Sequence, residues 1–234
     1  SASCPKDCGS IASSTFVYVL GTKGLTIFNV SQPSTPMIIT NYSGSLNPSI
    51  FRDIRVVNNK AYIVGNKILE VVGLTNIKSP QLLGKLSLTG DGYGIDVNNN
   101  IAYLAIQSEG LKIVDVSNPS NMQILSNYSS CYQNNDVVYH KGYVFLSCND
   151  PNAALVSVNV QNPSNPVYGS RGYTFGNTPQ QLDIDGERAF LPTLTGYVSR
   201  YNISILNGTQ GPYPLWNIYP PLSEFIVNSP YDVD

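Results

Sequence analysis

The chain has 234 residues, and only 12% of them are charged, about half the roughly 25% of an ordinary globular protein. A formal net charge of −2 provides no basic surface for nucleic acid or anionic lipid, which excludes a nucleic-acid-binding protein. The 19 glycines and 16 prolines disfavour long helices, and no apolar run approaches the ~18 residues of a membrane span. We therefore expect one all-β domain over residues 16–234, after an N-terminal extension, residues 1–15, that bears a disulfide.

The N-terminal extension holds Cys4 and Cys8, two of the four cysteines. The other two, Cys131 and Cys148, flank strand-like runs at 135–139 and 143–146 with a turn between them. In a hairpin folded about residue 140, position 131 falls opposite 148 or 149, where Cβ atoms ~4.5–5.5 Å apart permit a bridge. This geometry predicts a Cys131–Cys148 disulfide and, by default, a Cys4–Cys8 pair. The alternative is four free thiols in a cytosolic protein.

Five Asn-x-Ser/Thr sequons favour an exported glycoprotein. They are Asn29, Asn41, Asn127, Asn202 and Asn207. Asn41 and Asn127 both occur in the string Asn-Tyr-Ser, whereas the Asn29 side chain can instead close an Asx-turn. The start Ser-Ala-Ser-Cys resembles a mature end after signal-peptide cleavage, so we expect an extracellular or cell-surface location.

Two landmarks recur along the chain. An aromatic residue within a strand-like run occurs at positions 18, 62, 103, 143 and 190, with spacings of 44, 41, 40 and 47 residues. An apolar residue at the end of a later run occurs at positions 30, 74, 116, 160 and 203, with spacings of 44, 42, 44 and 43 residues. Four short strands in a unit of ~40–45 residues are typical of a β-propeller blade. An irregular β-sandwich with coincidental spacing is the alternative.

The third copy of this unit reads Gly-Leu-Lys-Ile-Val-Asp-Val-Ser-Asn-Pro over residues 110–119. It resembles the LVIVD repeat, in which a glycine and an apolar strand precede Asp-Val-Ser and Asn-Pro. Residues 24–32 and 155–163 are looser copies with Asn29 and Asn159 in place of the aspartate, and residues 67–78 depart further. The resemblance covers about residues 16–205. It implies a propeller typical of bacterial and archaeal surface proteins, and it supplies no catalytic residue.

The ends of the chain suggest how the propeller closes. Residues 9–14 of the first copy are small and polar, whereas the other copies have a good innermost strand there. The C-terminal residues 229–234 match residues 178–183 in form. We expect five blades of four antiparallel strands, with the C-terminal strand completing the first blade. If residues 225–234 instead insert into a neighbouring molecule, the chain polymerises by strand donation.

The proline-rich stretch 211–221 is expected to contain the outer strand of the fifth blade. It includes Trp216, the only tryptophan, between Tyr213 and Tyr219. These aromatic residues could form a docking patch for a sugar or a protein partner, or Trp216 could simply pack on the outer strand.

Residues with catalytic or metal-binding potential are few. The single histidine, His140, lies in a predicted exposed turn, and no Gly-x-Ser-x-Gly elbow accompanies it. Alignment on the aromatic strand places four acids and one arginine at equivalent inner-strand positions: Arg55, Asp96, Asp136, Asp183 and Asp234. Carboxylates from Asp96, Asp136 and Asp183 could hold calcium, which prefers oxygen ligands. Alternatively, these side chains cap strand turns or line a channel, and Arg55 opposes cation binding.

The sequence favours a non-enzymatic, glycosylated propeller at the cell surface or outside the cell. We expect it to act in adhesion or as a subunit of an extracellular assembly or filament, without a cofactor unless calcium binds. Its partners would be another protein, a second copy of the chain or a glycan. The alternative is a ligand- or cation-binding propeller, or a hydrolytic one, that acts at the mouth of the central channel through Asp96, Asp136 and Asp183.

Overall fold

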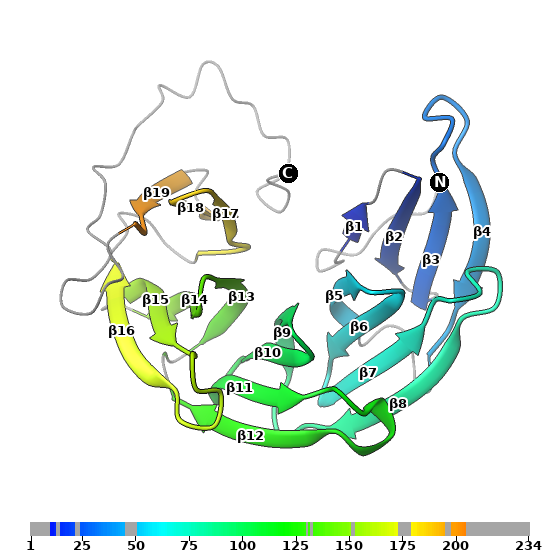
Figure 1. The fold of residues 1–234 in the computed structure, drawn as a ribbon. Helices are drawn as coiled ribbons and strands as arrows, with labels where there is room; N and C mark the ends of the chain where they lie inside the picture. The colour runs from blue at the N-terminus through cyan, green and yellow to red at the C-terminus, as the bar shows by residue number, and fades with distance from the viewer. Residues whose placement is uncertain are drawn as a thin grey trace. The chain divides into compact units, whose positions relative to one another are not determined.

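The computed structural model describes residues 10–12, 15–21, 24–44, 51–129, 131, 133–150, 153–172, 179–194 and 198–204. Within these residues the strands form five antiparallel sheets and there is no α-helix, which confirms the all-β class (Figure 1). Four of the sheets have four strands and one has three. Each sheet is a meander, because strands adjacent in sequence pair with each other.

The sheets follow one another along the chain. The first contains β1 (Ser10–Ala12), β2 (Phe16–Gly21), β3 (Gly24–Asn29) and β4 (Met37–Tyr42). The second contains β5 (Phe51–Val57), β6 (Lys60–Gly65), β7 (Ile68–Gly73) and β8 (Gln81–Ser87). The third contains β9 (Gly92–Asn98), β10 (Ile101–Ile106), β11 (Gly110–Asp115) and β12 (Gln123–Tyr128), with the 3-10 turn η2 (Pro119–Asn121) before β12.

The fourth sheet contains β13 (Asn134–His140), β14 (Tyr143–Asp150), β15 (Ala153–Asn159) and β16 (Val167–Gly172). The last sheet contains β17 (Asp183–Asp185), β18 (Arg188–Pro192) and β19 (Val198–Asn202). The proline-rich stretch 211–221 and Trp216, expected to supply a fourth strand here, lie outside the described residues.

Two compact units divide the chain, residues 1–102 with 115–123 and residues 103–114 with 124–234. In the first unit, the first and second sheets share a core of Tyr18, Leu20, Leu25, Ile27, Phe51, Ile54, Ala61, Ile63, Ile68, Val72 and Leu74. In the second unit, the fourth and last sheets share a core of Phe145, Ala154, Leu155, Leu182, Ala189, Leu191, Tyr201 and Ile203. Neighbouring sheets bury continuous apolar strands between them, so β6 and β10 are apolar rather than alternating.

Within a sheet, a tight turn joins the innermost strand to the second strand and fixes the register of that hairpin. Asn58 and Asn59 have φ of 50° and 57°, and Lys141 and Gly142 have φ of 48° and 84°. Two consecutive residues with positive φ make the type I′ turn that matches strand twist in a two-residue hairpin. Asparagine and glycine tolerate this left-handed backbone, so these turns are specified locally.

The second sequence landmark corresponds to a conserved feature of the structure in all five copies. The backbone N–H of each landmark residue donates to a carbonyl in the turn of the same copy at 2.8–2.9 Å. The pairs are Val30 to Thr15, Leu74 to Asn59, Val116 to Asn100, Val160 to Gly142 and Ile203 to Glu187. This bond closes the third strand against the inner hairpin in every copy, which confirms the repeat.

The first landmark needs one correction. An aromatic residue follows the turn carbonyl by three positions in each copy, at 18, 62, 103, 145 and 190. The equivalent residue of the fourth copy is therefore Phe145, which is fully buried, and the expected assignment to Tyr143 is wrong by two residues. Residues two apart on a strand share a face, so hydrophobic alternation alone could not separate them.

The first sheet also differs from expectation. β1 pairs antiparallel with β2, with Ser10 opposite Val19 and Ala12 opposite Val17. The expectation that the first copy lacks an inner strand of its own is wrong, because a ladder requires only backbone N–H and C=O groups, which small residues also carry. Residues 225–234, proposed to fill that place, lie outside the described residues.

Candidate functional site

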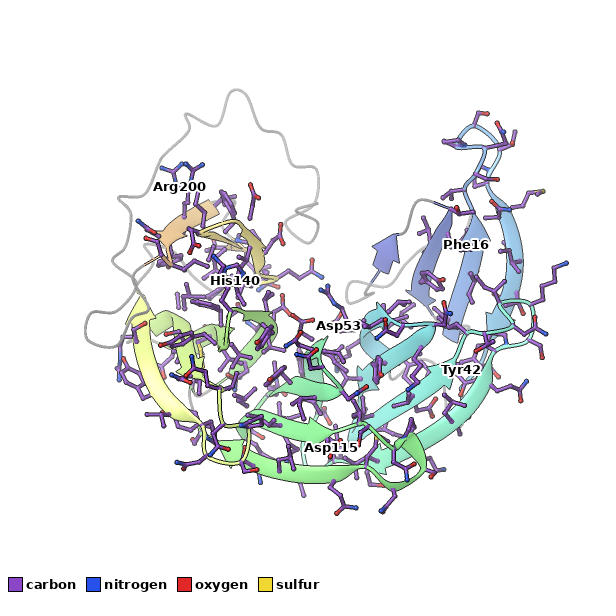
Figure 2. The ribbon with its side chains drawn as sticks, in the orientation of Figure 1. Phe16, Tyr42, Asp53, Asp115, His140 and Arg200 are labelled. Carbon is purple, nitrogen blue, oxygen red and sulfur yellow. A yellow bond between two sulfur atoms is a disulfide. The ribbon has the colours of Figure 1, made fainter. Side chains whose placement is uncertain are left out.

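Two inner-strand aspartates connect neighbouring sheets. Asp53 on β5 accepts the N–H of Ile54 at 2.7 Å and the N–H of Ile95 on β9 at 2.8 Å (Figure 2). Asp136 on β13 accepts the N–H of Val137 and the N–H of Leu182, just before β17, both at 2.7 Å. In each case one carboxylate oxygen bonds to its own strand and the other to the next inner strand. These carboxylates hold backbone donors in place.

The other inner-strand acids make different contacts. Asp96 is buried on β9, where it accepts the N–H of Val97 at 2.7 Å and lies 3.0 Å from Nε of Arg55. Asp183 is exposed and accepts the N–H of Ile184 at 2.8 Å. Arg55 therefore neutralises one of the acids that the sequence offered for a cation, as its charge led us to expect.

The aspartates are not equivalent in the way that the sequence alignment implied. Asp53 and Asp136 both lie five residues before the hairpin turn, whereas Asp96 and Asp183 lie three residues before it. Asp136 was therefore misaligned by the same two residues as Tyr143. Its hydrogen bonds to its own strand and to the next sheet match those of Asp53.

Burial strongly affects the acid at Asp53. Desolvation raises its pKa to about 6, and the nearby Asp96 carboxylate acts in the same direction. The hydrogen bonds from Ile95 and Ile54, together with the Arg55 charge, oppose this rise. Asp53 is thus an inter-sheet hydrogen-bond acceptor whose burial favours the protonated form.

The three acids predicted to hold calcium are divided between the two compact units. Asp96 belongs to the first unit, Asp136 and Asp183 belong to the second, and Asp234 lies outside the described residues. Across the part of the chain that the structure describes, no group of three or more His, Cys, Asp or Glu side chains could hold a metal ion. The carboxylate oxygens of Asp53 and Asp136 accept backbone hydrogen bonds instead.

The structure contains the disulfide predicted between Cys131 and Cys148, whose Cα atoms are 5.8 Å apart. The register is not the one from which the pair was predicted. Asn134 lies opposite Cys148, after a bulge between Asn134 and Asp136, so Cys131 reaches it from the segment before β13. Cys4 and Cys8 lie outside the described residues.

The sequons separate into two structural kinds. Asn29 and Asn202 end a third strand, and each amide oxygen accepts the N–H of the serine two residues later at 2.9 Å. Asn41 and Asn127 are exposed on the outer strands β4 and β12. Their amide oxygens accept from Thr26 at 2.8 Å and Lys112 at 2.7 Å, bonds that do not use the amide nitrogen to which a glycan attaches. Asn207 lies outside the described residues.

The same Asx-turn explains the most specific part of the repeat motif. Asp115 accepts the N–H of Ser117 at 2.8 Å, and Asn159 accepts that of Gln161 at 3.0 Å. The Ser117 hydroxyl and N–H hold the pKa of Asp115 below its usual value. Asn118 then accepts the N–H of Ser120 at 3.2 Å, beside the 3-10 turn that Pro119 begins. The string Asp-Val-Ser-Asn-Pro thus encodes two successive turns closed by side chains.

His140 lies at the end of β13, half-buried rather than in an exposed turn. Burial and the adjacent Lys141 lower its pKa, whereas Glu187 raises it. Lys141 forms an ion pair with Glu187 of the hairpin turn in the last sheet. The contacts of His140 and Lys141 are those of strand packing and turn pairing.

A pocket lies on the last sheet. It has a volume of about 530 Å³ and is lined by Asp185, Gly186, Glu187, Arg188, Arg200, Asn202 and Ser204. The sequence reasoning missed these residues because each, taken singly, reads as an ordinary solvated strand or turn residue. Comparison of the repeat copies position by position would have shown Arg200 as unusual.

These observations define the class of the protein: an all-β repeat protein whose described residues form four four-stranded antiparallel sheets and one three-stranded sheet. Many solved structures share this propeller-like fold, and two of them serve for comparison. The computationally designed Ika8 protein is 11% identical with a TM-score of 0.64, and the match covers 83% of this chain and 57% of that chain. A chain of the Nidogen/Laminin complex is 12% identical with a TM-score of 0.60, covering 87% of this chain and 76% of that one. At these identities the likeness shows the fold alone.

The model of the LVIVD-repeat family matches two stretches of the chain, as the motif suggested. The chain carries the LVIVD repeat over residues 10–44 and 89–130. The curated proteins contain no match to it. Among the described residues, no helix has the length and apolar character needed to cross a membrane.

Proposed function

We propose that this chain is a non-enzymatic five-bladed β-propeller that works outside the cytoplasm as a binding module, in adhesion or in an extracellular assembly. One observation carries the non-enzymatic part of the proposal. The acids that recur in the repeat are used to hold backbone: Asp53 and Asp136 join inner strands, and Asp115 closes a turn. A repeat whose polar residues maintain the scaffold suits a protein that presents a surface.

The proposed location is supported by two features. The chain contains the Cys131–Cys148 disulfide, and disulfides persist in oxidising compartments but are rare in the cytosol. Asn41 and Asn127 stand exposed on the outer strands of two repeat copies, where attached glycans would extend into solvent. Their equivalent positions suggest that glycans are spaced by the repeat.

Surface labelling of intact source cells tests this location. A membrane-impermeant amine-reactive biotin reagent should label the chain through exposed lysines such as Lys141, together with a known surface protein and without a cytoplasmic marker. Labelling of the chain only after lysis would contradict the proposal.

Sedimentation velocity over a range of concentrations then separates adhesion by a monomer from assembly into a polymer. A polymer that survives deletion of residues 225–234 would reject strand donation as its basis.

A further inference from the structure

The two faces of the last sheet differ in character. Ala189, Leu191 and Tyr201 are buried in the core shared with the fourth sheet. Arg188 pairs with Asn202, and Phe190 pairs with Arg200, so these four residues alternate with the buried ones and share the opposite face. Figure 2 shows the Arg200 side chain projecting away from the sheet.

Arg200 replaces a small or apolar residue of the repeat. The position three residues before the landmark amide holds Ile27, Val71, Ile113 and Ser157 in the first four copies, and each is fully buried. In the last copy the same position holds Arg200, and the facing aromatic residue, Phe190, is only half-buried. The substitution converts a position that serves packing into one that carries a guanidinium group.

That guanidinium group lines the pocket together with a second one. Arg188 and Arg200 are diagonal neighbours on adjacent strands, at Cα separations of roughly 7–8 Å for such positions. Among the described residues neither has an ion-pair partner, and Nε of Arg200 is buried without a hydrogen-bond acceptor. Of the two acids on the pocket wall, Glu187 is already paired with Lys141. A buried donor without an acceptor is costly unless a ligand supplies one.

We propose that this pocket binds the carboxylate of an acidic sugar. The planar fork of an arginine matches a carboxylate in a bidentate arrangement, and two such groups face the same space. Asp185 and Glu187 add negative charge to the wall, which disfavours a doubly charged phosphate relative to a singly charged carboxylate. The same side chains, with Asn202 and Ser204, offer hydrogen-bond acceptors for sugar hydroxyls. A volume of about 530 Å³ accommodates one or two sugar units.

The inference deepens the proposed binding role by naming a ligand class, and a titration of the purified full chain tests it. Isothermal calorimetry with glucuronate should give saturable binding, and glucose, which lacks the carboxylate, should give none. Arg200→Ile, which restores the residue of the first and third copies, should weaken glucuronate binding at least about tenfold through loss of a charge-assisted contact. Arg200→Lys keeps the charge and loses the fork, so it should fall between the two.

The control variant is Arg171→Ala, which removes an exposed arginine that packs on Tyr168 of β16, away from the pocket lining. It should bind glucuronate like the parent chain. Equal binding by Arg200→Ile, equal binding of glucose, or tighter binding of inorganic phosphate than of glucuronate would each overturn the proposal. Surface labelling is independent of this titration, so failure of the ligand assignment and failure of the proposed location can be told apart.

Discussion

Removal of the Asp136 carboxylate should destabilise the fold far more than removal of the Asp183 carboxylate. Asp136 accepts two backbone N–H groups at 2.7 Å, one of them from Leu182 ahead of the next sheet. Asp183 is exposed, and its carboxylate accepts the N–H of its neighbour Ile184. A hydrogen bond to a charged group contributes about 1.5–3 kcal/mol, and each buried donor left unsatisfied costs about 1–3 kcal/mol.

From these values, Asp136→Ala should lose about 3–5 kcal/mol of unfolding free energy. Asp183→Ala should lose at most about 1 kcal/mol, because water can replace its single contact. A domain is stable by about 5–15 kcal/mol, so the first loss is a large share of the whole. Asp136→Asn keeps one acceptor oxygen and should lie between the two.

Urea unfolding followed by tyrosine fluorescence and by circular dichroism measures both variants, and the slopes should stay equal if the transition remains two-state. Equal losses for Asp136→Ala and Asp183→Ala would refute the structural reading of the inner-strand aspartates. So would a rise of the parent midpoint in millimolar calcium that Asp136→Ala abolishes, since that result requires a bound cation.

Three further outcomes follow from the same contacts. Burial raises the pKa of Asp53 to about 6 from 3.8, so the folded state holds this proton more tightly than the unfolded state; stability should fall as pH rises from about 4 to about 6 and then level off. Asp53→Asn should remove that slope in urea midpoints measured at four pH values, and an unchanged slope would assign it to other groups. Cys148→Ser should lower stability by roughly 3 kcal/mol, because the unfolded chain gains the conformational entropy that the disulfide across 17 residues had restricted, and reduction of the parent should have a similar effect. Peptide mass mapping of the native protein should find glycans at Asn41 and Asn127, and none at Asn29 and Asn202, whose side-chain amides close Asx-turns. Full occupancy of Asn29 and Asn202 would contradict this expectation, because it would show that the Asx-turns do not prevent glycosylation.

The repeat was predictable from sequence because its signals are local. Turn residues with positive φ, an aromatic strand and an Asx-turn recur in each copy, and each depends only on near neighbours in the chain. The misassignment at Tyr143 shows the limit of that approach. Tyr143 and Phe145 are both aromatic and both suit the same face of β14, and only the position of the turn at Lys141 and Gly142 decides between them.

The candidate pocket could not be predicted from single residues, because it depends on strand pairing and on a comparison of equivalent positions in the repeat copies. Arg188 and Arg200 are unremarkable as single residues, and their placement on one face follows from the pairing of β18 with β19. The inter-sheet bonds of Asp53 and Asp136 likewise join residues 42 and 46 positions apart. No local pattern reveals which backbone amide lies within reach of a given carboxylate.

The Asx-turns have a consequence for how the chain acquires its structure during synthesis. Each sheet pairs strands that are adjacent in sequence, and each third strand ends in a turn that four of the copies close with their own side chain. The backbone ladder of a copy can therefore form from residues close in sequence, whereas its apolar strands become buried only when the next copy packs on them. Carboxylates such as Asp53 would then fasten each newly made sheet to the preceding one, so that growth proceeds in steps of one copy.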